Sequence, residues 1–279
     1  MTTALVDGDI LLYRCGFAAE KTKYLVEGEG VPGEGPSVLY YDSHKEIPKS
    51  VAKENIWSRK EIEPVENALN ALEASISYIM RQTGAEKYEV YISGSFNFRN
   101  AIAVTKPYKG NREGQAKPIH YAALRSALVD VYRAKVTDGG LEADDVLGIR
   151  LGQLGDSGVL VSIDKDLLQI PGRHYNWVTG EHVHIQPKDG HLYLGCQIIS
   201  GDPTDNVPGL PGLGEAKARK LLDGATNPKD MLARVRSQYI RHTGGDIDAA
   251  ALYFREQGSL VYILRSEGDS FQKYLEKYE

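Results

Sequence analysis

Three carboxylates stand within four positions in residues 141–148, which read LEADDVLG. Glu142 and Asp145 are three residues apart and share a face if the stretch is helical, with Asp144 beside them. One interpretation is a simple helix cap, because each acid at a helix start gains about 0.3–1 kcal/mol from the helix dipole. The other is a divalent cation that relieves the repulsion among the three acids. Carboxylates elsewhere in the chain bear on this choice.

Further carboxylates are expected where strands end and in turns. The apolar run at residues 4–6 ends at Asp7, and the apolar run at residues 158–163 ends at Asp164. Asp166 is expected on the same side as Asp164 if the chain stays extended. The full set comes from four segments and consists of Asp7, Glu142, Asp144, Asp145, Asp164, Asp166, Asp202 and Asp205. Ordinary caps and turn aspartates are the alternative for any one segment, but four segments together favour a metal site.

The donor set is made of oxygen atoms and contains no His or Cys. Oxygen ligands suit a hard cation, Mg²⁺ or Mn²⁺. Because Mg²⁺ usually takes one or two carboxylates and keeps several waters, eight acids exceed the needs of one ion. Two ions roughly 3.5–4 Å apart would use them better, and such pairs serve phosphodiester cleavage. One ion then lowers the pKa of an attacking water while both stabilise the in-line transition state.

The elements that must position these acids alternate between strand and helix patterns. Short apolar runs are typical of buried strands, and apolar residues at three- and four-residue steps are typical of helices. The expected strands are residues 4–6, 88–94, 131–136 and 158–163, and the expected helices are residues 10–19, 64–83 and 119–132. This alternation predicts an α/β fold with a central, mostly parallel sheet flanked by helices. In such sheets ligands bind beyond the carboxyl ends of the strands.

Other segments are expected to be less regular. Residues 20–56 are polar and rich in Gly and Pro, which suggests a small hairpin insertion. Residues 174–198 are predicted to form a short meander with two strands, and the chain after residue 214 is predicted to be helical.

A glycine-rich turn at residues 209–214, GLPGLG, runs into the expected helix at residues 215–222. Glycines let backbone N–H groups approach a phosphate at a helix start. A dinucleotide-binding fingerprint is excluded because no apolar strand precedes the turn and Lys217 stands where the third glycine is needed. Two interpretations stay open. The turn is either a plain connector between helices or a helix–hairpin–helix segment that binds the DNA backbone regardless of sequence.

A basic and aromatic stretch extends from residue 96 to residue 112. In its last part, YKGNR, Lys109 and Arg112 could neutralise a scissile phosphate and Tyr108 could stack on a base. Arg99 belongs to the same stretch. A solvated basic loop is the alternative interpretation.

The composition is that of an ordinary globular protein of 279 residues. The formal net charge of −5 argues against a polyanion partner, but it becomes +3 when the eight acids above are set aside. The two cysteines, Cys15 and Cys196, fit neither a metal spacing nor a disulfide framework, which favours a reduced, cytoplasmic setting. Acids interrupt the first apolar residues, so no signal peptide is expected, and no apolar run approaches the ~20 residues of a membrane span.

Taken together, these residues resemble the 5′-3′ exonuclease and flap-endonuclease superfamily, especially its bacteriophage members. The resemblance covers nearly the whole chain, from residues 6–8 through 142–145 and 164–166 to the segment 201–214. That last segment resembles the family's helix–three-turn–helix, and residues 108–112 resemble the base of its helical arch. In relatives the strand ending near residue 94 often ends in an aspartate. Gly94 or Ser95 stands there instead, and the insertion at residues 20–56 matches no part of the family.

The resemblance implies two domains and a role for each site residue. It implies a PIN-like catalytic domain over residues 1–198, with an arch region at residues 96–120, and a DNA-binding helix–three-turn–helix subdomain over residues 199–279. Asp7, Glu142, Asp144 and Asp164 would serve the first metal, and Asp145, Asp166, Asp202 and Asp205 the second or its water shell. Lys109 and Arg112 would contact the scissile phosphate. The residues that would contact DNA are Arg99, Tyr108, Gly209, Gly212, Gly214 and Lys217. A monovalent cation, often K⁺, is implied at the helix–three-turn–helix.

The implied activity is that of a two-metal, 5′-3′ exodeoxyribonuclease in DNA replication or recombination. Its substrate would be double-stranded DNA with 5′ ends, and RNA–DNA hybrids as well. Alternatives are a structure-specific 5′ flap endonuclease and a catalytically impaired relative that only binds DNA. A monomer without membrane partners, in the cytoplasm of a bacterium or of a phage-infected host cell, is expected.

Overall fold

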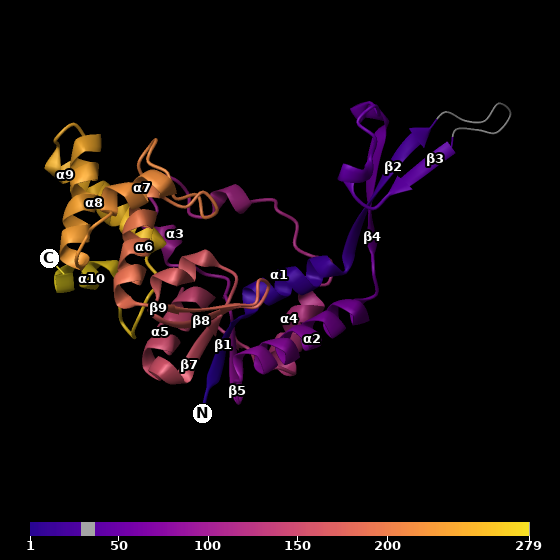
Figure 1. Ribbon diagram of the computed structural model, residues 1–279, viewed down its shortest axis with the longest axis horizontal. Helices are drawn as coiled ribbons and strands as arrows, with labels where there is room; N and C mark the ends of the chain where they lie inside the picture. Colours follow the sequence, from indigo (N-terminus) through magenta and orange to yellow (C-terminus); the bar gives the residue numbers. More distant parts are fainter. Residues whose placement is uncertain (29–36, 279) are drawn as a thin grey trace. The chain divides into compact units, whose positions relative to one another are not determined.

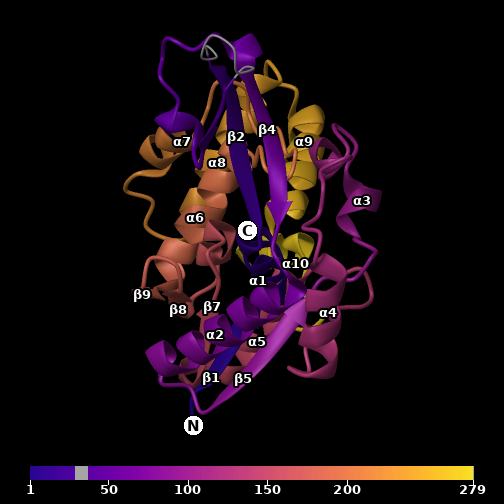
Figure 2. The same ribbon diagram turned by 90° about the vertical axis from the view of Figure 1, so that its right-hand side faces the viewer.

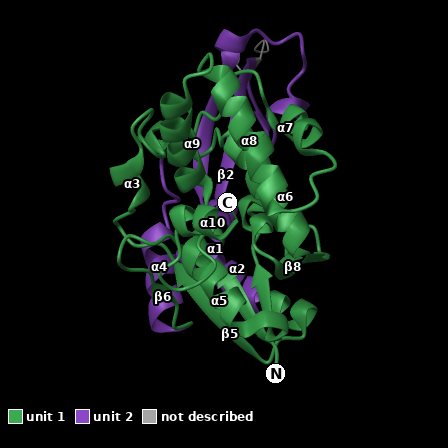
Figure 3. Cartoon of the chain, turned by 90° about the vertical axis from the view of Figure 1, so that its left-hand side faces the viewer, with its two compact units in different colours: residues 1–10, 78–115, 132–279 green, residues 11–77, 116–131 purple. Residues whose placement is uncertain are grey.

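The computed structural model describes residues 1–28 and 37–278. The chain divides into two compact units (Figure 3). Unit 1 consists of Met1–Ile10, Tyr78–Gln115 and Tyr132–Glu279, and unit 2 consists of Leu11–Ser77 and Ala116–Val131. Every residue of the predicted site belongs to unit 1. The tip of the predicted insertion, residues 29–36, lies outside the described residues.

Unit 1 is built on a six-stranded sheet with the order β6-β5-β1-β7-β8-β9. Its strands are β1 (Thr3–Asp7), β5 (Lys87–Ile92), β6 (Lys135–Val136), β7 (Gly158–Val161), β8 (Gly172–Asn176) and β9 (Glu181–Ile185). Neighbouring strands run parallel except β8 and β9. All residues of β1 are buried, as expected for a parallel strand covered on both faces. The prediction of a mostly parallel α/β sheet is confirmed.

The strand register brings the predicted site segments to one edge of the sheet. Val6 of β1 pairs with Val90 of β5 and with Val161 of β7, and Asp7 pairs with Tyr91. The carboxyl ends of these three parallel strands are therefore level, and the chain segments that follow them emerge side by side.

Helix α5 (Ala143–Leu154) begins at this edge and contacts β1, β5 and β7. Leu147 and Leu151 of α5 are buried with Leu5 and Leu160 of the sheet. A side chain at Gly148 would meet the carbonyl oxygen of Leu264 at 2.4 Å, so α5 also lies directly against the chain segment 260–265. The helix start is thus fixed between the sheet and this segment.

The rest of unit 1 is mainly helical (Figure 1). The helices are α3 (Arg99–Ile102), α6 (Pro187–Ser200), α7 (Glu215–Leu222), α8 (Pro228–His242), α9 (Ile247–Val261) and α10 (Phe271–Tyr278). Short 3₁₀ helices η3 (Gly110–Arg112), η4 (Gly155–Ser157) and η5 (Lys165–Gln169) connect elements. Helix α6 contacts α7, α8 and α9. The helical C-terminal region is confirmed, whereas the predicted domain boundary between residues 198 and 199 falls inside α6, with unit 1 on both sides.

Helix α6 corrects the meander expected at residues 174–198. The two strands form as β8 and β9, but residues from Pro187 onward are helical. The glycines that weaken the helix propensity of this segment are places of close packing. A side chain at Gly190 would meet the carbonyl oxygen of Gln169 at 2.6 Å, and one at Gly195 would meet the sulfur of Met231 at 2.4 Å. Tertiary packing therefore overrides the local preference.

Unit 2 contains a three-stranded antiparallel sheet of order β3-β2-β4. It is formed by β2 (Glu20–Gly28), β3 (Ser37–Tyr41) and β4 (Ile56–Ile62), with 3₁₀ helices η1 (His44–Glu46) and η2 (Lys53–Asn55) between β3 and β4. Figure 2 shows β2 and β4 side by side. The helices of this unit are most of α1 (Gly8–Ala18) and α2 (Val65–Thr83), and all of α4 (Tyr121–Asp130). The predicted hairpin is present and carries a third strand.

Two further findings bear on the sequence-based expectations. Both cysteines are free and buried, so neither forms a disulfide. Over residues 1–28 and 37–278, no helix combines the length and the apolar character that a membrane span requires.

Candidate metal centre

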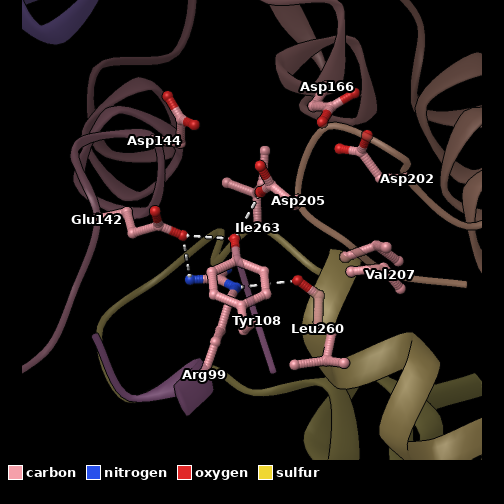
Figure 4. A pocket seen from close by; sticks show the side chains of 11 residues that line it. Arg99, Tyr108, Glu142, Asp144, Asp166, Asp202, Asp205, Val207, Leu260 and Ile263 are labelled. Carbon is pink, nitrogen blue, oxygen red and sulfur yellow. Dashed lines mark hydrogen bonds and ion pairs between the residues drawn. The ribbon is translucent and has the colours of Figure 1, made fainter. Parts of the chain in front are cut away.

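A polar pocket in unit 1 collects five of the eight predicted metal ligands (Figure 4). Helix α5 supplies Glu142 at its cap and Asp144 in its first turn, and η5 supplies Asp166. The turn after α6 supplies Asp202 and Asp205. The three segments are far apart in the sequence, and the fold brings their carboxylates to one place.

Asp7, at the end of β1, is buried close to this pocket. The hydroxyl of Ser162 donates to its Oδ2 at 2.8 Å, and the backbone N–H of Ile10 donates to its Oδ1 at 3.1 Å. Burial raises the pKa of Asp7 to about 7, and the charges of Asp9 and Asp164 add to the rise. Burial and the charges of Asp7 and Asp164 raise the pKa of Asp144 well above its ordinary value. These acids therefore repel one another at close range.

Asp164 and Asp166 stand at the start of η5, not on an extended segment as predicted. Asp164 caps η5 by accepting a hydrogen bond from the backbone N–H of Asp166 at 2.9 Å. Burial raises the pKa of Asp166 to about 8, and the negative charges of Asp164 and Asp202 add to the rise. Figure 4 shows Asp166 and Asp202 next to each other. Asp202 is held in place by two backbone hydrogen bonds with Val207, each 2.8 Å long.

The chemistry of this donor set fits divalent cations. The side chains offer oxygen atoms, and burial together with mutual repulsion leaves several of them short of compensating positive charge. In the described part of the chain, no three or more His, Cys, Asp or Glu side chains form a ready-made metal site. Ions bound here would therefore complete their coordination with water, as Mg²⁺ commonly does.

Lys109 and Arg112 lie inside the site. The ammonium of Lys109 is bonded to Glu142 and is 3.5 Å from Oδ2 of Asp205, and Arg112 is bonded to Asp205. Burial alone would raise the pKa of Glu142, but the charges of Lys109 and Arg99 outweigh it and lower that pKa. The loop is anchored by its backbone, since the N–H of Lys109 donates to the carbonyl of Asp205 at 2.9 Å. The two cations that were predicted to contact phosphate are thus placed against the acids.

Two residues of the predicted site, Asp145 and Arg99, form a buried ion pair beside the carboxylates. Asp145 is fully buried, and Arg99 binds both of its carboxylate oxygens at 2.8 Å. The guanidinium also donates to the carbonyl oxygens of Leu260 and Tyr262 at 3.0 and 2.6 Å. Asp145 was expected to ligate a metal and Arg99 to contact DNA. Both expectations are corrected. Arg99 occupies both oxygens of Asp145, and its buried guanidinium lies at the wall of the pocket, where it also donates to Glu142 Oε2 at 3.2 Å.

Tyr108 also departs from its predicted role. Its ring is 7% exposed and belongs to the apolar core of the helical region, so it offers no free face for a base. Its hydroxyl lies 2.8 Å from Glu142 Oε2 and 2.7 Å from Asp205 Oδ2 (Figure 4). The expectation of base stacking is corrected to a contact that orients two carboxylates.

The glycine-rich turn divides into a buried part and an exposed part. Gly209 is buried, its N–H donates to Gln257 Oε1 at 2.9 Å, and a side chain there would meet the nitrogen of Gly201 at 2.2 Å. Gly209 therefore serves packing, and its N–H is not available to a phosphate. Gly212, Gly214 and Lys217 are exposed at the start of α7. For these three, DNA contact stays a prediction.

Asp9 is an acid near the site that the sequence interpretation did not include. It lies in the first turn of α1, and both of its carboxylate oxygens accept a hydrogen bond from the N–H of Ser93, at 3.2 and 3.1 Å. The available signal was the spacing of Asp7 and Asp9 around one glycine at the end of a strand.

Sequence comparisons relate the chain to known nucleases. No protein-family model matches it. It is 33% identical over 138 residues to the exodeoxyribonuclease of Enterobacteria phage T3, which covers 46% of this chain and 44% of the relative. It is 32% identical over 146 residues to the exonuclease of Escherichia phage T7, covering 48% and 47%. It is 30% identical over 159 residues to a 5′-3′ exonuclease of Buchnera aphidicola, covering 51% and 54%. The chain spans about half the length of these curated relatives.

Solved structures show the same fold. A flap endonuclease of bacteriophage T5, in a pseudo-enzyme–product complex with DNA and metal ions, matches with a TM-score of 0.58 and 16% identity over 100% of this chain and 98% of that one. A T5 protein co-crystallised with metal ions matches with a TM-score of 0.58 and 17% identity over 94% and 89%. The sheet and the helical C-terminal region thus share the α/β fold of these T5 structures. In sequence, about half of the chain is similar to 5′-3′ exonucleases of phages and bacteria.

Proposed function

We propose that this protein is a metal-dependent 5′-3′ exonuclease that hydrolyses phosphodiester bonds at 5′ ends of double-stranded DNA. The observation that carries the proposal is the set of buried, mutually repelling carboxylates at the carboxyl edge of the sheet. Relatives named as exonucleases support the reaction, and the T5 structures with metal ions support divalent cofactors.

Two Mg²⁺ or Mn²⁺ ions would be held by the acids of this edge. Asp7, Asp144 and Asp164 would serve one ion, together with Glu142. Asp166, Asp202 and Asp205 would serve the other. Bound ions of this kind activate a water and stabilise the in-line transition state. Asp145 is excluded from either group because Arg99 occupies its oxygens.

The chain's own cations would act on the substrate. Lys109 and Arg112 neutralise Glu142 and Asp205, which are among the acids proposed to hold the ions. With divalent ions supplying that positive charge, the ammonium and the guanidinium would be available to the scissile phosphate. Tyr108 would keep Glu142 and Asp205 oriented during this exchange.

DNA would be bound by the exposed part of the glycine-rich turn. Gly212 and Gly214 offer accessible backbone before α7, and Lys217 adds a positive charge. A K⁺ ion at the helix–three-turn–helix would supply further positive charge toward the DNA backbone. We place the protein, as a monomer, in DNA replication or recombination in the cytoplasm of a bacterium or phage-infected cell. This placement rests on the phage and bacterial sources of the relatives.

Flap cutting is the second candidate activity, favoured by the likeness to the T5 flap endonuclease. One experiment separates the candidates. The protein is incubated with 5′-labelled duplex, 5′-flap and RNA–DNA hybrid substrates, with Mg²⁺ or with a chelator, and the products are sized. Short products from the duplex that vanish with chelator support the exonuclease, and cutting near the flap junction supports the endonuclease. Chelator-resistant cleavage, or no cleavage of any substrate, would contradict both.

A further inference from the structure

Asp9 is fixed in position by the element on which it stands. Helix α1 begins against β5, because a side chain at Gly8 would meet the carbonyl oxygen of Tyr91 at 2.6 Å. This close approach sets the direction of the first turn of α1, and Asp9 receives the N–H of Ser93 on both carboxylate oxygens. The carboxylate therefore lies at the carboxyl end of β5, within the edge that bears the metal site.

Ser93 connects Asp9 to helix α5. Its Oγ accepts a hydrogen bond at 3.0 Å from the N–H of Ala143, the residue directly after Glu142. A residue larger than glycine cannot stand at Gly94, where a side chain would meet the carbonyl oxygen of Thr137 at 2.5 Å. Residues 92–94, at the end of β5, thus contain no carboxylate. Asp9, from the first turn of α1, places one there instead.

The charge of Asp9 acts on the metal site. After burial, it is the next cause that raises the pKa of Asp7. Burial also raises the pKa of Asp9, while the N–H of Ser93 and the charge of Lys109 favour its ionised form. Ser93 supplies a neutral N–H, which fixes the carboxylate without cancelling its charge. A carboxylate held in this way strengthens the negative potential of a neighbouring cation site.

We infer that Asp9 is a further carboxylate of the metal site, which adds its charge to the binding of divalent ions and positions the start of α5 through Ser93. This inference rests on the proposed metal-dependent function. The competing explanation is a plain structural link between α1 and β5, in which only the shape and the hydrogen bond of Asp9 count.

The substitution Asp9→Asn distinguishes the two, because an amide oxygen still accepts from Ser93 while the charge is gone. Mn²⁺ is titrated into the full chain, without DNA, by isothermal calorimetry. We expect Asp9→Asn to weaken Mn²⁺ binding by about tenfold, the scale seen when a group behind a metal ligand is changed, with an unchanged circular dichroism spectrum. The matched control is Asp156→Asn, which removes one charge from an exposed residue of η4 and should bind Mn²⁺ as the parent chain does.

Two outcomes would overturn the inference. If Asp9→Asn binds Mn²⁺ like the parent chain, Asp9 is only a structural link. In that case Asp9→Ala, which also removes the hydrogen bond to Ser93, would lower the melting temperature without changing Mn²⁺ affinity. Asp7→Asn separates this failure from failure of the proposed function. If Asp7→Asn weakens Mn²⁺ binding and Asp9→Asn does not, only the role of Asp9 is refuted, whereas unchanged binding in both refutes the metal site itself.

Discussion

Two neighbouring aspartates in the first turn of α5 lie in opposite electrostatic environments. On one side Asp144 faces the carboxylate pocket, where burial and neighbouring acids raise its pKa. On the other side its neighbour Asp145 faces the core, where Arg99 and backbone N–H groups occupy its oxygens. A buried carboxylate that the protein compensates with its own cation contributes to structure. A carboxylate left among other acids is suited to bind an added cation.

The largest expected effect comes from breaking the buried ion pair between Arg99 and Asp145. Asp145→Asn leaves the buried guanidinium of Arg99 without its anionic partner, and removal of one member of such a pair costs about 3–5 kcal/mol of unfolding free energy. Urea denaturation followed by circular dichroism measures this loss. Replacing both members, as in Arg99→Met with Asp145→Leu, should recover much of it. A single variant as stable as the parent chain would show that the pair is not structural.

The matching substitution at the pocket-facing Asp144 should leave the stability of the fold unchanged and remove nuclease activity. Asp144→Asn eliminates a carboxylate whose ionisation is opposed by burial, so the unfolding free energy should be unchanged or higher at neutral pH. Mg²⁺-dependent cleavage of 5′-labelled duplex should fall at least about 100-fold, since a metal ligand matters no less than the groups behind it. Cleavage at the parent rate would remove Asp144 from the site.

A smaller effect, on metal affinity, is expected from Lys109, whose ammonium pairs with acids of the pocket. Lys109→Met takes away the ammonium that neutralises Glu142 and Asp205, so divalent ions no longer compete with it. Mn²⁺ affinity in the absence of DNA should rise several-fold. A rise of about tenfold, which corresponds to one pKa unit, is the upper limit expected. At the same time, DNA binding should lose salt dependence by about one phosphate contact. Lys87→Gln, at the opposite end of β5, is the control and should change neither quantity.

The smallest effect is a pH dependence of the uncompensated acids. The pKa values of Asp7 and Asp166 are raised to about 7 and about 8, above those of the unfolded chain, mainly by burial. The folded protein therefore holds these protons longer than the unfolded chain, and its stability without metal falls as pH rises toward that range. Metal binding must release the protons, so Mn²⁺ affinity should increase from pH 6 to pH 8. Calorimetry at pH 7 in buffers of different ionisation enthalpy measures this release, and its absence would contradict the raised pKa values.

The sequence was sufficient for the fold class because its signals are local. Apolar runs and three- and four-residue periodicity identify β1, β5, β7 and α2 without any tertiary information. Helix α6 could not be recognised in this way, since Gly190 and Gly195 reduce its helix propensity and are tolerated only because Gln169 and Met231 pack against them. The resemblance to 5′-3′ exonucleases came from motifs at fixed positions, and the similarity to the phage exonucleases agrees with it.

The sequence by itself determined that acids stand at the ends of strands and at a helix start, because those positions follow from local patterns. Only the tertiary structure decided which of these acids keep an uncompensated charge. Asp144 and Asp145 are adjacent and identical in type, and what separates them is Arg99, distant in sequence and folded against one of them. Asp9 likewise joins the edge only because β5 lies beside the start of α1. Charge compensation acts through space, and a linear sequence does not state which distant side chains share a space.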